Sequence, residues 1–351
     1  MKIRFQLLIA LAVVPFLLVA CTSSEETTTN EKETETDNED YGELISMFDP
    51  LGDVAIPEDN PMTEETIELG KTLFFDPRLS GNDKLSCATC HLPDLGFSDG
   101  VPLFSGFEGA EGPRRTPTII NTGYYTSFFW DGRADSLEEQ SLGPISSPIE
   151  MNMDLDELAG KLSDVDGYPE MFAEAFGEDI TIDNIAKALA AYERTIVIED
   201  TPFDQFLEGD YDALTEQEIE GMELFAGDAQ CITCHNGPNL TDNEFYNIGL
   251  DSDDKGRMEI TEDEADDGSF RTAGLYGVAH HAPYMHDGSL ETLEEVIDFY
   301  DRGGDGHPNT SGLIDKLNLE DSEKEALLSF LMVLSDDSIL EVDAPELPGM
   351  Q

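Results

Sequence analysis

Two copies of a Cys-x-x-Cys-His motif constrain this chain more than any other feature. The motifs consist of Cys87, Cys90 and His91 and of Cys231, Cys234 and His235. Two thiols at this spacing can form thioethers with the vinyl groups of one haem, and the adjacent imidazole then binds the iron. The alternative is one zinc site built by both cysteine pairs, but it would give the histidines no role. The sequence therefore predicts two covalent c-type haems, haem 1 on the first motif and haem 2 on the second.

The fifth cysteine lies at the end of an N-terminal apolar segment. Lys2 and Arg4 precede an apolar run that ends at Ala20, directly before Cys21. This pattern is typical of a bacterial lipoprotein signal. A membrane-spanning anchor is the alternative, but the run is short for a span. We therefore expect residues 1–20 to be a signal peptide, and the exported protein to be held in the periplasm by a lipid on Cys21.

Acidic residues dominate the rest of the chain. Residues 21–47 contain few apolar side chains and are predicted to be a disordered acidic tether. The whole chain has 77 acidic and 18 basic residues, a formal net charge of -59. Nucleic acid and anionic membranes are poor partners for such a surface. Because the acidic excess is spread along the chain, it favours a solvated surface over a docking site for a basic partner.

Beyond the tether, the apolar residues follow the period of helices. Residues 185–192 form the strongest amphipathic segment, and 325–334 form another. Four hydroxyl residues are each followed three positions later by Glu, a pattern typical of helix starts. They are Ser136, Thr215, Thr292 and Ser322.

An internal repeat indicates two related halves. Arg115-Thr116, Asp131-Gly132 and Leu137-Glu138-Glu139 recur 156 positions later (271 minus 115) as Arg271-Thr272, Asp287-Gly288 and Leu293-Glu294-Glu295. A Gly-x-x-Leu-Phe element also precedes each haem motif, beginning at Gly70 and Gly221. The repeat predicts an all-α fold of two cytochrome c-like domains, residues 48–205 and 206–345, with one haem each.

The side chains available as a second axial ligand differ between the halves. No histidine lies between His91 and Cys231, although Met151 and Met153 remain candidates for haem 1. The simplest prediction is that the distal side of haem 1 is open, as a peroxide-binding iron requires. The candidates for haem 2 are Met285, His286 and Tyr300.

Five short stretches carry a more specific signal. They are Phe75-x-x-Arg78-Leu79-Ser80, Phe129-Trp130-Asp131-Gly132-Arg133, Pro148-Ile149-Glu150-Met151, Pro283-Tyr284-Met285-His286-Asp287-Gly288 and Tyr300-x-x-Gly303-Gly304. With them the chain resembles the bacterial di-haem cytochrome c peroxidase and MauG family, over about residues 60–336. The resemblance implies an oxidoreductase that reduces hydrogen peroxide at haem 1, with electrons that reach haem 2 from a small donor such as a c-type cytochrome.

The resemblance also implies roles for single residues. Trp130 is similar to the Trp between the two haems, and Glu150 to the carboxylate that carries a proton over haem 1. An ordinary core aromatic and a solvated surface carboxylate are the alternatives. Where many members have a His that blocks haem 1, this chain has Phe107. Where they supply a Met to haem 2 it has Tyr300, and both differences resemble the MauG branch, in which a Tyr ligates haem 2.

Two other functions stay open at this point. One is a MauG-like oxidase that modifies a partner protein, and the other is an electron carrier without catalytic activity. Whether the protein forms a homodimer is also open. The family's calcium site uses an Asn and a Thr where this chain has Arg115 and His281. A guanidinium there can take the place of the cation, so calcium is a doubtful cofactor.

Overall fold

A computed structural model describes residues 41–349 of the chain, which are rich in helix and contain little sheet. The predicted signal peptide, the lipid site at Cys21 and the tether as far as residue 40 lie outside these residues. The α-helices are α1 (Gly42–Ile45), α2 (Glu64–Phe75), α3 (Cys87–Cys90), α4 (Leu137–Ser146), α5 (Leu155–Ser163), α6 (Tyr168–Phe176), α7 (Ile182–Glu193), α8 (Pro202–Leu207), α9 (Glu216–Ala226), α10 (Met258–Thr261), α11 (Leu293–Asp301) and α12 (Asp321–Met332). Two short strands, β1 (Phe245–Tyr246) and β2 (Phe270–Arg271), pair antiparallel. From residue 41 to 349, no helix has both the length and the apolar character that a membrane span needs.

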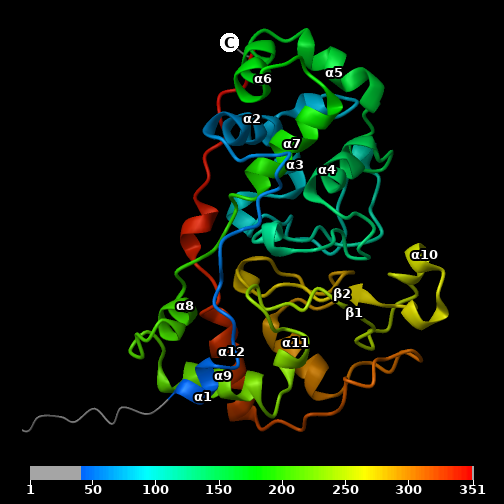
Figure 1. Cartoon of the computed structure of the whole chain (residues 1–351). Coiled ribbons are helices and arrows are strands. Elements are labelled where there is room, and N and C mark those ends of the chain that lie inside the picture. The colour runs from blue at the N-terminus through cyan, green and yellow to red at the C-terminus, as the bar shows by residue number, and fades with distance from the viewer. Residues whose placement is uncertain (1–40, 350–351) are drawn as a thin grey trace, which may run out of the picture. The chain divides into compact units, whose positions relative to one another are not determined.

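The repeated glycines explain how the main helices pack. Helix α2 packs on α7, and α9 packs on α12 (Figure 1). Each pair brings a Gly of the repeat against a backbone carbonyl. A Cβ atom on Gly70 would lie 1.9 Å from the carbonyl oxygen of Ala188. On Gly221 it would lie 2.0 Å from that of Ala326. Only glycine allows both helix pairs to approach this closely.

The same repeat element places an aromatic ring beside each haem-motif histidine. Phe74, which follows Gly70 by four residues in α2, lies with its ring centroid 6.5 Å from that of His91. Phe225 occupies the matching place in α9, 6.4 Å from His235. Both phenylalanines are buried. The repeat seen in sequence is therefore a repeat of packing, although the division into two cytochrome c-like domains remains a prediction.

Three of the four predicted helix starts are confirmed. Ser136, Thr215 and Thr292 are the N-caps of α4, α9 and α11, and each accepts a hydrogen bond from the amide of the Glu three residues on. The start at Ser322 is wrong, because α12 is capped by Glu320 two residues earlier. The amide of Glu320 donates to Glu323 Oε2 at 2.7 Å. Two glutamates therefore form the N-terminal capping interaction in place of a hydroxyl residue and a Glu.

The two ends of the described chain pack against the opposite halves. Tyr41 lies within the segment 21–47 that was expected to be a tether, yet its ring centroid is 5.2 Å from that of Phe206. Phe48 is stacked on Phe225 of α9, with 6.1 Å between ring centroids. At the other end, Arg78 Nη1 donates to the carbonyl of Pro348 at 2.8 Å, and the C-terminal segment ends beside α6 (Figure 1). The folded part therefore begins before residue 48.

Candidate functional site

A cavity of about 910 Å³ lies at the first Cys-x-x-Cys-His motif. Cys87, Cys90 and His91 line it, and so do Trp130 and Glu150, which the sequence analysis singled out. The wall also includes residues from much later in the chain, such as those around 253–260 and 271–274. The fold therefore brings the first haem motif, the Trp and the Glu to one site, and closes it with segments of the second half.

The two motif histidines are held in the tautomer that an iron ligand needs. His91 Nδ1 lies 3.0 Å from the carbonyl oxygen of Phe97, and His235 Nδ1 lies 3.1 Å from that of Leu240. Burial lowers the pKa of both imidazoles, so they are neutral. A neutral ring that donates from Nδ1 to a carbonyl offers the lone pair of Nε2 to a metal. Together with the cysteine pair at each site, this donor set fits a c-type haem.

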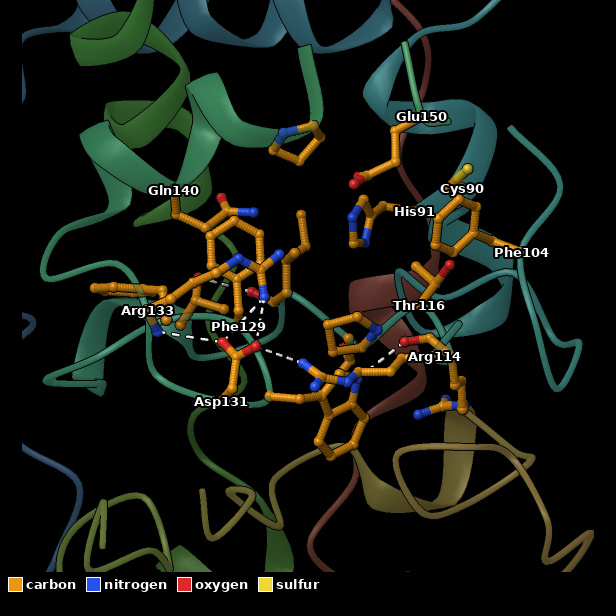
Figure 2. Close-up of a pocket in the computed structure, with 18 of the residues that line it drawn as sticks. Cys90, His91, Phe104, Arg114, Thr116, Phe129, Asp131, Arg133, Gln140 and Glu150 are labelled. Atoms are coloured by element: carbon orange, nitrogen blue, oxygen red, sulfur yellow. Dashed lines mark hydrogen bonds and ion pairs between the residues drawn. The ribbon is translucent and has the colours of Figure 1, made fainter. Parts of the chain in front are cut away.

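Glu150 is a carboxyl group with an altered acidity that faces the cavity. It follows the end of α4, and its amide donates to the carbonyl of Ser147 at 3.1 Å. Burial raises the pKa of Glu150, whereas the Ser147 hydrogen bond and the charge of Arg133 lower it. Figure 2 shows Glu150, Gln140 and His91 directed into the same space. A carboxyl group in these surroundings can accept a proton as the carboxylate and donate it as the acid.

The loop that could carry a blocking histidine is packed against the backbone of Glu150. Phe107 donates its amide to the carbonyl of Ile149 at 3.2 Å, and its ring lies by Gly81. A Cβ atom on Gly106 would lie 2.1 Å from the Ile149 oxygen, so this close approach requires glycine. Phe104, rather than Phe107, is the phenylalanine of this loop that lines the cavity. Met151, a candidate ligand from the sequence, lines it as well.

Trp130 is fixed by hydrogen bonds to two arginines, one from each half. Its indole Nε1 donates to the carbonyl oxygen of Arg115 at 2.9 Å. Its own carbonyl accepts from the amide of Arg271 at 2.9 Å. The residue is therefore part of the junction between the halves, and its place between two haems stays a prediction.

At the second motif, the structure separates the candidate ligands. Tyr300 on α11 lies close enough to Cys231 and Cys234 for both to raise its pKa, although burial is the larger cause. His286 is stacked on Phe270 instead, with 3.7 Å between ring centroids. Its Nε2 lies 3.3 Å from the hydroxyl of Ser252. Tyr300 therefore lies near the second cysteine pair and His286 is held by other partners, while ligation by Tyr300 rather than Met285 stays a prediction.

Arg115 occupies the position at which the resemblance implied calcium. Its Nη2 donates to the carbonyl of His281 and, at 3.0 Å, to the hydroxyl of Ser98. Across residues 41–349, no three His, Cys, Asp or Glu side chains are grouped as a metal site. The two cysteine pairs do not come together there, which counts against the zinc alternative. Calcium remains doubtful.

The cavity wall also contains residues that were not predicted from the sequence. Gln140 on α4 and Glu193 at the end of α7 both line it. Burial raises the pKa of Glu193 to about 8. A signal was present for Glu193, because it lies four residues after Leu189 on the buried face of an amphipathic helix. For Arg271 the signal was the repeat, which pairs it with Arg115.

Comparison with known proteins shows which proteins this chain is similar to. A family model described as di-haem cytochrome c peroxidase matches residues 64–212. The methylamine utilization protein MauG of Methylorubrum extorquens is 40% identical over 315 residues, which cover 88% of this chain and 89% of that protein. Cytochrome c551 peroxidase of Pseudomonas aeruginosa is 39% identical over 270 residues, 73% of this chain and 78% of that protein.

A solved structure agrees with these relatives. The crystal structure of a MauG-like protein associated with microbial copper homeostasis has a TM-score of 0.78 to this chain and is 36% identical in sequence. The match covers 83% of this chain and 95% of that one. Since relatives this similar extend over most of the chain, the protein belongs to the di-haem cytochrome c peroxidase family, which includes the MauG proteins.

Proposed function

We propose that this protein reduces hydrogen peroxide to water with electrons from a small c-type cytochrome. Membership of a di-haem family implies two c-type haems. Their proposed attachment residues are Cys87 and Cys90 with His91 as iron ligand, and Cys231 and Cys234 with His235. When bound, each haem supplies an iron that exchanges single electrons, and an iron with an open side can also bind peroxide.

Glu150 carries this proposal. Its carboxyl faces the cavity of the first motif, and burial raises its pKa. Reduction of peroxide to two waters needs two electrons and two protons, and the O–O bond breaks more easily when the leaving oxygen is protonated. Glu150 can accept a proton from one oxygen of hydrogen peroxide and donate it to the other, which then leaves as water. Gln140, across the same cavity, can donate a hydrogen bond to the peroxide.

Trp130 and Tyr300 are proposed to serve the electron supply. Hydrogen bonds tie Trp130 to both halves, so its indole can lie on the route of electrons between the two sites. Tyr300, close to the second cysteine pair, is proposed as the second ligand of haem 2. A phenolate is an anionic oxygen donor and favours the ferric state, whereas a Met thioether favours the ferrous state.

A second candidate function is the oxidation of residues in a partner protein, as in the MauG branch. Phe107, in place of a blocking histidine, and the position of Tyr300 favour it. Both functions would use peroxide at the same cavity, so turnover with a reduced cytochrome separates them. A carrier without activity should instead have six-coordinate iron at both sites.

The test starts from the purified holoprotein in the fully ferric state. We expect a mass that exceeds the polypeptide by two haems, a high-spin EPR signal from one of them, and a spectral change with peroxide that needs no prior reduction. Catalytic oxidation of a reduced c-type cytochrome should follow. The variant in which Cys231 and Cys234 are replaced by Ala should retain one haem. A wholly low-spin protein that is inert to peroxide would contradict the proposal.

We also propose that the protein is exported and bound to a membrane by a lipid on Cys21. Lys2, Arg4 and the apolar run before Cys21 support this. Replacement of Cys21 by Ser should abolish the lipid mass on the mature N-terminus and move the protein to the soluble periplasmic fraction.

A further inference from the structure

Three buried N–H groups without acceptors line the cavity of the first motif. In residues 41–349, six buried side-chain nitrogen or oxygen atoms lack a hydrogen-bond partner. Half of them, Arg115 Nε, Arg271 Nε and His281 Nε2, belong to residues of this one wall. Since a buried donor without an acceptor is destabilising and rare in proteins, such a cluster indicates a ligand with acceptor atoms.

The state of His281 adds to the set of donors. Its Nδ1 lies 3.3 Å from Arg115 Nη2, which can only donate, so Nδ1 is the acceptor. Burial lowers the pKa of this imidazole to about 3, and the ring is therefore neutral. A neutral ring with an accepting Nδ1 carries its proton on Nε2, which makes the unpartnered Nε2 a donor.

Neither Arg115 nor Arg271 forms an ion pair within residues 41–349, although Asp99 is near enough for its charge to raise the pKa of Arg115. Arg114, in the same wall, pairs with Asp131 at 2.5 Å and with Asp254 at 2.6 Å. Arg115 donates only to neutral groups, and burial lowers its pKa to about 10. Arg271 lies over the ring of Tyr125, 3.6 Å from its centroid, and no carboxylate of the described chain pairs with either guanidinium.

The repeat places these two arginines at equivalent positions. The amide of Arg115 donates to the carbonyl of His286 at 2.7 Å, and that of Arg271 donates to the carbonyl of Trp130 at 2.9 Å. His286 is the repeat partner of Trp130, so each arginine is held by the opposite half through the same bond. Two fixed positive charges, one from each half, thus meet at one cavity.

We propose that Arg115 and Arg271, assisted by His281, bind the propionate carboxylates of the porphyrin in this cavity. The inference rests on the haem attachment proposed above, which supplies the carboxylates. A guanidinium presents parallel N–H donors that match a carboxylate, and the pair is strongest where water is excluded. Thioethers fix one part of the porphyrin, and the arginines fix its acidic groups.

This pairing has an electrochemical consequence. A positive charge held near the haem opposes the gain of charge on oxidation, so it raises the reduction potential. It also keeps the propionates ionised over the working pH range. Without the arginine, a propionate can take up a proton when the iron is reduced, and the potential becomes pH-dependent.

The test measures the potentials of the holoproteins Arg115→Gln and Arg271→Gln between pH 5 and 8. At a fixed applied potential, we expect the ratio of ferrous to ferric haem to fall about tenfold, which corresponds to a shift of 59 mV for one electron. The ratio should also vary with pH. Lys316→Gln removes an exposed positive charge outside the cavity wall and should leave the potentials unchanged. Arg115→Lys and Arg271→Lys retain the charge and should restore the ratio.

Haem content by mass separates this inference from the attachment that it assumes. Wild-type protein without two covalent haems would refute the attachment itself. Glutamine variants that carry two haems and match the wild-type potentials at every pH would overturn the arginine assignment. If those variants do not fold, the lysine variants serve, because a single ammonium changes the hydrogen bonds to the carboxylate. Unaltered propionate bending modes in their resonance Raman spectra would then overturn it.

Discussion

Glu150 and Glu193 are two carboxyl groups in the wall of one cavity, but their surroundings differ. For Glu150, the hydrogen bond from Ser147 and the charge of Arg133 offset part of the effect of burial. For Glu193, burial is the main cause and raises the pKa to about 8. Glu193 is therefore largely protonated at neutral pH, whereas Glu150 has partners that favour its carboxylate form. This difference in environment supports the proposal that Glu150, rather than Glu193, transfers the proton.

Replacement of Glu150 by Gln should slow the reaction of the ferric protein with peroxide by about 10²–10⁴-fold, because the shape is kept and the proton acceptor is lost. In the wild type, the accepting form of Glu150 is the carboxylate. The rate should therefore rise with pH through the raised pKa of this group, and the variant should lack that limb. Stopped-flow spectra across the pH range measure both effects. A variant that matches wild type at every pH would remove Glu150 from the mechanism.

At the scale of single elements, local patterns predicted helices well and tertiary contacts poorly. The caps at Thr215 and Thr292 follow from neighbouring residues, and so does the helix that carries Tyr300. The cap of α12 was missed because Glu320 can replace a hydroxyl. That Arg271 has no carboxylate partner could not be predicted, because this depends on how the tertiary structure places residues that are distant in sequence.

The glycine at the crossing of α9 and α12 provides a test at this scale. Gly221→Ala places a Cβ atom 2.0 Å from the carbonyl oxygen of Ala326, so the helices must move apart. We expect a loss of about 1–3 kcal/mol in the free energy of unfolding, measured by denaturant titration. Gly160 in α5 has no atoms within 4 Å of such a Cβ. Gly160→Ala should instead stabilise by about 0.5–1 kcal/mol, and equal effects of both changes would contradict the packing argument.

At the scale of the whole molecule, the junction between the halves is the proposed route of electrons between the two sites. Trp130 is central to it, with Arg115 on its indole nitrogen and Arg271 on its carbonyl. The repeat indicated that both halves would resemble each other, and the packing of Gly70 and Gly221 agrees. It did not indicate that the arginines of both halves would line one cavity. The repeat describes the structure of each half, and not how the two halves pack together.

Trp130→Phe should slow electron transfer between the two sites without slowing the reaction with peroxide. Loss of the indole N–H leaves the buried carbonyl of Arg115 without this donor, at a cost of about 1–3 kcal/mol of stability. The initial reaction with peroxide should persist, since Glu150 is unchanged, while reduction of the first site by the second should slow. Single-turnover measurements on the half-reduced protein follow each step. Wild-type rates for both would exclude Trp130 from the electron route.

The exchanged ends of the chain bear on how such a protein can evolve. Internal repeats of this kind are the expected product of gene duplication, and a duplicated gene can in principle shed one copy again. Here, deletion of the second copy would remove Phe206 and Phe225, the aromatic neighbours of Tyr41 and Phe48. Deletion of the first would leave the tail around Pro348 without its contact to Arg78. Because each end of the chain packs on the other copy, neither copy keeps all of its contacts alone. We therefore expect the two haem motifs to be retained or lost together.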